Sequence, residues 1–587
     1  MKLAMTWDLE CFYAGGSGSS ALEECFEQIE AGLYQLDKNL KEKSHLPSVL
    51  ELLQVVEMHL RQVRNFAHCL VAQNSRDTRG LCTQNRAAQL SAFLAALSSK
   101  LDEWLLELEE SAFQELINDQ KEIAFPLSER RRLARSKLPA QEEGLISALS
   151  VDGYQGWTDL WSSLVRDISF PHRGRRLAFN QMEALLEVPD CEERREAFEA
   201  IEKGVQPLQN TFAQTLNHLA GFRLKVYEKR GWDSPLQEAL TLNRLEQKTL
   251  DVMWETTEKN QQALTDFLQC KAGLLKQQQL HWSDLSAPAL PPNTSISYQE
   301  ASAFMVKHFS QISPKLAGFV EEVLQDQWID AENRPGKSPG GFCTAFPLNK
   351  ESRIFMTYLN TTSSLLILAH ELGHAFHNSV LFSLPEMTQR CPMNLAETAS
   401  TMSEMMILQA SIDQAEEPAA KLSLLENHLN RAASYLLNIR SRFLFELAFY
   451  RERQRGFVPA GRLCELMQSA QEESFQGNLA SYHPFFWATK MHFFLTDVPF
   501  YNFPYAFGYL FSLGIYALAS HLPRFEERFI ALLKESGQTS TEALAQKHLD
   551  VDLREASFWQ MAFDVINKDS ATFCSLASAA SKKASLK

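Results

Sequence analysis

Residues 361–377 read Thr-Thr-Ser-Ser-Leu-Leu-Ile-Leu-Ala-His-Glu-Leu-Gly-His-Ala-Phe-His. The four hydroxyl residues at the start are of the kind that caps a helix, and the apolar run after them favours a helix. On a helix, residues four apart project from one face, so His370 and His374 can converge on one ion with Glu371 beside them. This H-E-x-x-H spacing is typical of two zinc ligands and a general base. The stretch therefore predicts a helix that carries the metal ligands His370 and His374 and the catalytic base Glu371.

A second helix is predicted over residues 394–404, which read Asn-Leu-Ala-Glu-Thr-Ala-Ser-Thr-Met-Ser-Glu. Glu397 and Glu404 are seven apart and therefore share a helix face. A carboxylate from this face can complete a His/His/Glu site that leaves one coordination position for water, as in catalytic zinc centres. We expect Glu397 to bind the metal and Glu404 to hold an imidazole in the required tautomer, with the reverse assignment as the alternative. The predicted cofactor is one Zn2+ per chain.

The motif has competing interpretations. An H-E-x-x-H match arises by chance in roughly a few per cent of chains of this composition, and it then marks two surface histidines. A three-histidine metzincin site would need a glycine and a third histidine at fixed spacing, but His377 and Val380 occupy those positions. His377 could itself join the ligands, although a helical residue one turn beyond His374 would project past the ion. The class with a glutamate ligand is therefore favoured.

Helical periodicity dominates the rest of the chain. Residues 21–117 carry apolar positions three and four apart, which predicts an antiparallel array of helical hairpins. A Gly-rich turn at 144–157 and a short strand pair within 167–177 suggest a boundary. Helices resume over 183–280, and the Pro-rich segment 282–293 predicts a loop. We expect a mainly α fold with an N-terminal helical region (1–115), a connecting subdomain (116–200) and a catalytic domain (201–587).

Composition and charge limit the partners and the compartment. The chain has 587 residues and a formal net charge of −15, a sign that disfavours a general binder of nucleic acid or anionic membranes. Its ten cysteines are scattered, which is typical of reduced intracellular thiols. The N-terminus lacks the apolar core of a signal peptide, and the apolar segment 503–522 is interrupted by polar residues, which favours a buried helix over a membrane span. We expect a cytoplasmic protein without nucleic-acid or membrane partners; monomer and dimer both stay open.

Further stretches resemble the M3 peptidases, in particular those of the oligoendopeptidase F type. Besides residues 368–377 with Glu397 downstream, they are Gly336-Lys337-Ser338-Pro339-Gly340-Gly341-Phe342, Trp282-Ser283-Asp284-Leu285-Ser286-Ala287-Pro288 and Trp7-Asp8-Leu9. The resemblance covers essentially the whole chain. It implies a multi-helix fold with a small β-sheet beside the active site and a deep substrate channel that admits short unfolded peptides.

A late segment rich in histidine and tyrosine binds substrate and stabilises the tetrahedral intermediate in this family, and residues 492–509 resemble it. The resemblance implies catalytic roles for His492, Tyr501 and Tyr505, because imidazole and hydroxyl donors suit an oxyanion. Which tyrosine acts stays open, and Tyr509 is a further candidate that would bind substrate.

The short run 354–358, Ile-Phe-Met-Thr-Tyr, has the composition of a β-strand. A strand beside an active site could pair with an extended peptide by backbone hydrogen bonds. Phe355 and Met356 are therefore candidate substrate-binding residues.

Together these expectations predict a zinc-dependent endopeptidase, a metalloendopeptidase that hydrolyses short, unstructured oligopeptides. Glu371 would take the proton of the attacking water and pass it to the leaving amine. Two alternatives stay open. One is a metallocarboxypeptidase with the same helical fold, which would release single C-terminal residues, and the other is a catalytically silent peptide-binding protein.

Overall fold

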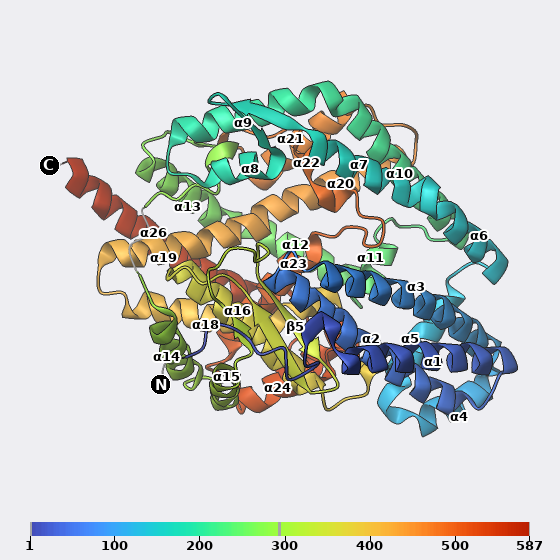
Figure 1. The fold of residues 1–587 in the computed structure, drawn as a ribbon. Coiled ribbons are helices and arrows are strands. Elements are labelled where there is room, and N and C mark those ends of the chain that lie inside the picture. Colours follow the sequence, from blue (N-terminus) through green and yellow to red (C-terminus); the bar gives the residue numbers. More distant parts are fainter. Residues whose placement is uncertain (1–2, 291–294, 586–587) are drawn as a thin grey trace. The chain divides into compact units, whose positions relative to one another are not determined.

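The computed structural model describes residues 3–290 and 295–585, and helices far outnumber strands among them (Figure 1). The chain divides into two compact units, each assembled from three separate segments. The first unit comprises Met1–Lys137, Thr294–Ala410 and Ala519–Asp550, and the second comprises Leu138–Asn293, Ser411–Leu518 and Val551–Lys587. The mainly α fold expected from the sequence is confirmed. The division at residues 115 and 200, and the substrate channel, stay predictions.

The first unit begins with the predicted hairpin array. The helices α1 (Ser20–Glu42), α2 (Leu46–Gln73) and α3 (Thr78–Glu107) pack against one another because their apolar positions repeat every three or four residues (Figure 1). The other helices of this unit are α4 (Glu110–Asp119), α5 (Ala124–Arg135), α14 (Tyr298–Phe309), α15 (Pro314–Gln325), α16 (Thr362–Leu381), α17 (Met393–Ala396), the first part of α18 (Thr398–Gln414), α24 (Phe525–Glu535) and α25 (Thr541–Leu549).

A three-stranded sheet lies beside α16 in the first unit. Its strand order is β4 (Ile329–Asp330), β6 (Glu351–Phe355) and β5 (Phe342–Phe346), with β4 parallel and β5 antiparallel to β6. Both β5 and β6 contact α16, and β5 also contacts α2 (Figure 1). The predicted small sheet beside the H-E-x-x-H helix is therefore present.

The second unit is also helical. Its predicted strand pair is confirmed as the antiparallel hairpin of β1 (Ser169–His172) and β2 (Arg175–Ala178), and β3 (Leu280–His281) pairs with β7 (Leu479–Ser481) in parallel. Its helices are α6 (Ala140–Ser150), α7 (Gly156–Asp167), α8 (Phe179–Ala184), α9 (Cys191–Val205), α10 (Gln209–Arg230), α11 (Gln237–Leu242), α12 (Gln247–Lys259), α13 (Gln261–Leu274), the end of α18, α19 (Pro418–Ala433), α20 (Ile439–Arg453), α21 (Ala460–Ser474), α22 (Phe486–Thr489), α23 (Phe503–Leu518) and α26 (Ala556–Ser585).

Two features stabilise the interior of the second unit. The apolar helix α23 is buried along most of its length, as expected for a core helix. In the part of the chain that the structure describes, no helix has the length and apolarity that crossing a membrane requires. The predicted Pro-rich loop begins with a short 3₁₀ turn, where the buried carboxylate of Asp284 accepts hydrogen bonds at 3.1 and 2.7 Å from Nε and Nη2 of the buried Arg194. The end of this loop, from residue 291, lies outside the described residues.

Candidate metal centre

The helix α16 carries the H-E-x-x-H motif as predicted. It begins after Thr361, whose hydroxyl accepts a hydrogen bond from the amide of Ser364 at 3.1 Å, so the hydroxyl cluster caps the helix. His370 and His374 stand on one face of α16, with their ring centroids 4.8 Å apart. Side chains of both are about a quarter exposed, which leaves the pair accessible.

Glu397 lies against both imidazoles. Its Oε2 is 3.2 Å from Nε2 of His370 and 3.3 Å from Nε2 of His374. Burial alone would raise the pKa of the Glu397 carboxyl, but hydrogen bonds from the two imidazoles outweigh it and hold that pKa well below its usual value. The carboxylate also accepts a hydrogen bond at 2.7 Å from the hydroxyl of Ser400, which fixes its orientation.

The segment that carries Glu397 differs from the prediction. A continuous helix was expected over residues 394–404, but Glu397 itself lies at the break between α17 and α18, with φ −90° and ψ 4°. No glycine or proline marks this break in the sequence, so the pattern did not reveal it.

Gly373 allows this segment to approach α16 closely. A Cβ on Gly373 would lie 2.5 Å from the carbonyl oxygen of Ala399 and 2.6 Å from Cα of Ser400. Real Cβ atoms essentially never come this close to another atom, and the atoms concerned are main chain. Position 373, directly before His374, must therefore be glycine for Glu397 to reach the two imidazoles.

Glu404 lies behind His370. It is 4% exposed, and its Oε2 is 3.4 Å from Nδ1 of His370, an ion-pair distance without the alignment of a hydrogen bond. With a metal ion bound, a carboxylate at Nδ1 would hold the proton there and leave the lone pair of Nε2, the nitrogen on the Glu397 side, free to bind the ion.

Glu371 points to the same region but is more deeply buried, with 7% of its surface exposed. Burial raises the pKa of its carboxyl; the nearby His374 and His370 oppose the shift and Glu397 adds to it. A Cβ on Gly341, the residue before β5, would lie 3.6 Å from Oε1 of Glu371. The start of β5 therefore passes next to this carboxylate.

His377 does not join this cluster. Its Nε2 lies 3.2 Å from the carbonyl oxygen of Leu533 and 3.1 Å from the hydroxyl of Ser536, both at the end of α24. Burial lowers the pKa of His377 to about 4, so the ring is neutral at pH 7 and donates from Nε2 to the Leu533 carbonyl. Its role is to join α16 to α24.

The geometry of this cluster fits a metal ion. Among the described residues, His370, His374 and Glu397 are the group whose ligand atoms all lie within 4.8 Å of one another. Two imidazole nitrogens and one carboxylate oxygen are a donor set that suits zinc and leaves a coordination position open. That these three residues bind a metal ion stays a proposal.

The predicted histidine of the late segment has a well-defined local environment within the second unit. Nη1 of Arg442 donates to Oδ1 of Asn502 at 2.9 Å, and Nδ1 of His492 lies 2.6 Å from the same oxygen. Because arginine can only donate, this atom of Asn502 must be the acceptor, and His492 must carry its proton on Nδ1. Burial, together with the charges of Arg442 and Lys490, lowers the pKa of His492 to about 4 despite the Asn502 bond. The structure thus holds a neutral imidazole whose Nε2 has the lone pair.

Tyr501 and Tyr505 lie together after this histidine. Their hydroxyl oxygens are 2.6 Å apart, and both side chains are partly exposed. The residue before them, Phe500, has a positive φ of 51°, and its amide donates at 3.1 Å to Oε1 of the buried Glu446. This hydrogen bond stabilises a backbone conformation that is unfavourable for phenylalanine and so fixes the start of the Tyr501 segment.

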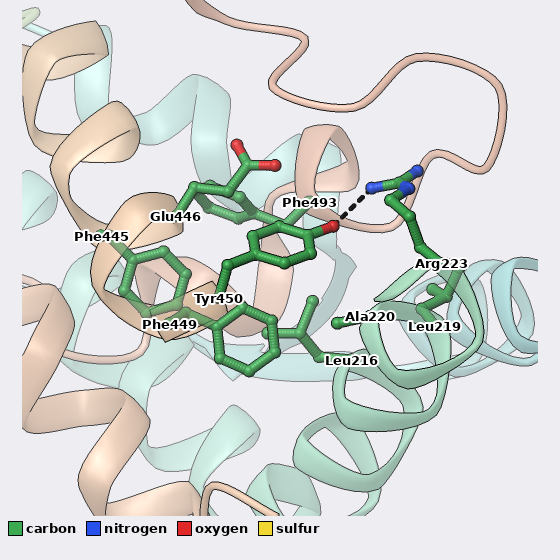
Figure 2. A pocket seen from close by; sticks show the side chains of 9 residues that line it. All are labelled: Leu216, Leu219, Ala220, Arg223, Phe445, Glu446, Phe449, Tyr450 and Phe493. Carbon is green, nitrogen blue, oxygen red and sulfur yellow. Dashed lines mark hydrogen bonds between the residues drawn. The ribbon is translucent and has the colours of Figure 1, made fainter. Parts of the chain in front are cut away.

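Figure 2 shows the small cavity next to Glu446, with a volume of about 10 Å³. The hydroxyl of Tyr450 accepts a hydrogen bond from Nη1 of Arg223 at 2.6 Å, and Nη2 of Arg223 donates to the carbonyl oxygen of Leu495 at 2.8 Å. Burial raises the pKa of Glu446 to about 7. A cavity of this size holds at most one water molecule.

Two sets of predicted substrate-binding residues are buried. Tyr509 is 4% exposed and stacks on Tyr435, so it does not present its hydroxyl to a ligand. Phe355 and Met356 are 0% and 1% exposed. The prediction that their strand pairs with a peptide is wrong, because β6 is the central strand and both of its edges are occupied. The predicted run 354–358 overlaps β6 only at residues 354–355, and the pattern could not reveal the place of that strand in the sheet.

Sequence comparison relates the whole arrangement to known peptidases. The sequence pattern of peptidase family M3 matches residues 306–550, and the pattern named oligopeptidase F matches residues 104–170. Group B oligopeptidase PepB of Streptococcus agalactiae is 23% identical over 96% of this chain and 95% of its own length. Oligopeptidase PepF of Bacillus subtilis is 22% identical over 73% of this chain and 66% of its own. A crystal structure of a peptidase from Chlamydophila abortus has the same fold, with a TM-score of 0.84 and 21% identity over 97% of this chain and 98% of that one.

Proposed function

The chain belongs to peptidase family M3, a family of peptide-hydrolysing enzymes, and from this membership we propose that it is a zinc-dependent endopeptidase for short, unstructured oligopeptides. The single observation that carries the proposal is the convergence of His370, His374 and Glu397, from two separate helical segments, on one small volume. The similarity to oligopeptidases such as PepB supports the substrate class.

Each residue of the cluster has a role in this proposal. His370, His374 and Glu397 would hold one Zn2+, which when bound supplies Lewis-acid activation of the scissile carbonyl and of the attacking water. Glu404 keeps the proton of His370 on Nδ1, so that Nε2 can act as a ligand. The Gly373 contact keeps Glu397 at ligand distance.

Glu371 acts as the general base. Its burial raises its pKa, which makes the carboxylate a better proton acceptor than an exposed glutamate would be. It takes the proton of the water on a carboxylate oxygen and returns it to the nitrogen of the leaving amine. The predicted donors to the oxyanion are Tyr501 and Tyr505, and substitution of each is the test of that part of the prediction. The neutral His492 has its lone pair on Nε2, so it can accept a hydrogen bond from the substrate but cannot donate one to the oxyanion.

Two variants test the core of the proposal. Glu371→Gln should retain zinc, because no ligand changes, but lose about a hundredfold or more of peptide turnover, because the base is absent. His374→Ala should lose both zinc and turnover. The control is Glu115→Gln, an identical substitution at an exposed position of α4, which should change neither.

The assay uses short peptides with a blocked C-terminus, zinc-loaded protein and metal analysis of each variant. An endopeptidase cleaves such peptides internally, whereas a carboxypeptidase leaves them intact. Full activity of Glu371→Gln, or zinc-loaded protein that is inert towards every peptide tested, would refute the proposal.

A further inference from the structure

The exposed edge of the sheet beside Glu371 can be identified from the hydrogen bonds of β6. The amide of Ile354 donates to the carbonyl oxygen of Trp328 at 2.9 Å, and the amide of Met356 donates to that of Asp330 at 3.0 Å. The main-chain groups of positions 354 and 356 therefore face β4. Alternate residues of a strand face opposite neighbours, so positions 351, 353 and 355 face β5, opposite 346, 344 and 342. The main-chain groups of Cys343 and Ala345 therefore point away from the sheet.

These two outward positions differ. The carbonyl oxygen of Ala345 accepts a hydrogen bond at 2.7 Å from the side-chain amide of Asn65 on α2. In contrast, no side chain in residues 3–290 and 295–585 bonds to the main chain of Cys343; the nearby Asn378 contacts only its sulfur, at 3.7 Å. The edge of β5 thus has one open position, followed by one that Asn65 occupies.

The open position is near the predicted base. Gly341, two residues before Cys343, is exposed and lies next to Oε1 of Glu371. If Glu371 acts on the scissile bond, a peptide along this edge has that bond near Gly341. Antiparallel pairing is the more stable form for such an edge. The peptide then runs opposite to β5, and the residues that approach Ala345 are those N-terminal to the cleaved bond.

We propose that Asn65 is a specificity-determining residue that ends the pairing of β5 with a peptide substrate after Cys343. The peptide residue opposite Ala345 lies four positions N-terminal to the residue opposite Gly341, about 14 Å along the strand. At that point the carbonyl that would receive the next peptide amide is already occupied. The substrate therefore cannot form the carbonyl half of the two hydrogen bonds that a paired residue exchanges, so regular pairing stops at Ala345. This inference rests on the proposed peptidase function.

The test uses peptides that share one cleavage site and are extended one residue at a time on the N-terminal side. For the wild-type protein, kcat/KM should rise until the peptide reaches Cys343 and then stay level. Asn65→Ala frees the carbonyl of Ala345, so the ratio of kcat/KM between a peptide that reaches Ala345 and one that stops at Cys343 should rise about two- to tenfold, the range for one hydrogen bond.

Two controls make the test specific. Methylation of the peptide nitrogen that would meet Ala345 should abolish the gain in Asn65→Ala. Asn39→Ala, which removes a partly exposed asparagine that bonds Gln35 on α1, should keep the wild-type length profile.

The outcomes separate this inference from the function that it rests on. If the wild-type protein cleaves the peptides and Asn65→Ala has the same length profile, Asn65 does not limit the pairing. If the length dependence appears in peptides extended on the C-terminal side instead, the direction of pairing is wrong and the inference fails. If zinc-loaded wild-type protein cleaves none of them, the proposed function itself fails.

Discussion

Replacement of Gly373 by alanine should weaken zinc binding by displacing a ligand that is not itself changed. The new Cβ would lie 2.5 Å from the carbonyl oxygen of Ala399, whereas ordinary contact begins at 3.4 Å, so the two helical segments must separate by about 0.9 Å. Metal–ligand distances tolerate changes of only about 0.2 Å. Glu397, two residues before Ala399, would therefore leave its position beside the imidazoles.

The size of the change follows from two opposing effects on the free energy of unfolding and from one effect on zinc affinity. Overpacking of a close contact costs about 1–3 kcal/mol, while alanine in a helix is favoured over glycine by about 1 kcal/mol. The metal-free Gly373→Ala protein should therefore be destabilised by only about 0–2 kcal/mol and remain folded. Its zinc affinity should fall by at least about ten- to a hundredfold, the range seen when the partner of a ligand is lost.

The assay is zinc competition against a chelator of known affinity, together with thermal unfolding of the metal-free and zinc-loaded forms. The matched control is Gly318→Ala in α15, where a Cβ would meet no atom within 4 Å. This control should be stabilised by about 0.5–1 kcal/mol with unchanged zinc affinity. If Gly373→Ala binds zinc as tightly as the wild-type protein, the close approach of α18 does not position Glu397 and the reasoning is refuted.

Three further perturbations have predictable outcomes. Because the pKa of His377 is about 4 when folded and near 6.5 when unfolded, its neutral form contributes stability that is complete above pH 6.5 and is lost as the pH falls towards 4; about 2 kcal/mol should be gone by pH 5. Chemical denaturation at pH 7 and pH 5 should show a smaller loss for His377→Gln, and an equal loss would contradict this. Asp284→Ala leaves the Arg194 guanidinium buried without its carboxylate and should cost about 3–5 kcal/mol, measured by the denaturation midpoint; a loss below 1 kcal/mol would be inconsistent with this pair. Asn502→Leu removes the acceptor that orients His492 and should lower kcat up to about a hundredfold with zinc content unchanged, whereas a merely structural role would lower thermal stability and leave kcat intact.

Local patterns allowed much of the fold and of the candidate site to be predicted. His370 and His374 depend only on helical periodicity within five residues, and the cap at Thr361 adjoins them in the sequence. Glu397 and Glu404 were predicted as a pair because residues seven apart share a helix face. The break between α17 and α18 at Glu397 was not predicted. Each of these signals lies within one or two turns of helix.

The features that the sequence did not reveal depend on contacts between distant segments. The order of β4, β6 and β5 is fixed by pairing across the sheet, so the edge strand could not be distinguished from the central one. Asn65 is separated from Ala345 by 280 positions, and Arg442 from Asn502 by 60. Gly373 is visible in the sequence as part of the motif, but only its contact with Ala399 explains why a glycine is required there.

The interleaving of the two units has a consequence for how the protein is made. The first unit needs residues from the opening segment, from 294–410 and from 519–550, while the core of the second is completed when α26 packs against α13 and α23. During synthesis, the earlier segments therefore leave the ribosome before the segments that they pack against. Until those later segments emerge, the apolar faces of the earlier ones stay exposed to solvent. Neither unit could be expressed alone as an uninterrupted fragment, and a chain cut before residue 550 would leave both cores unfinished.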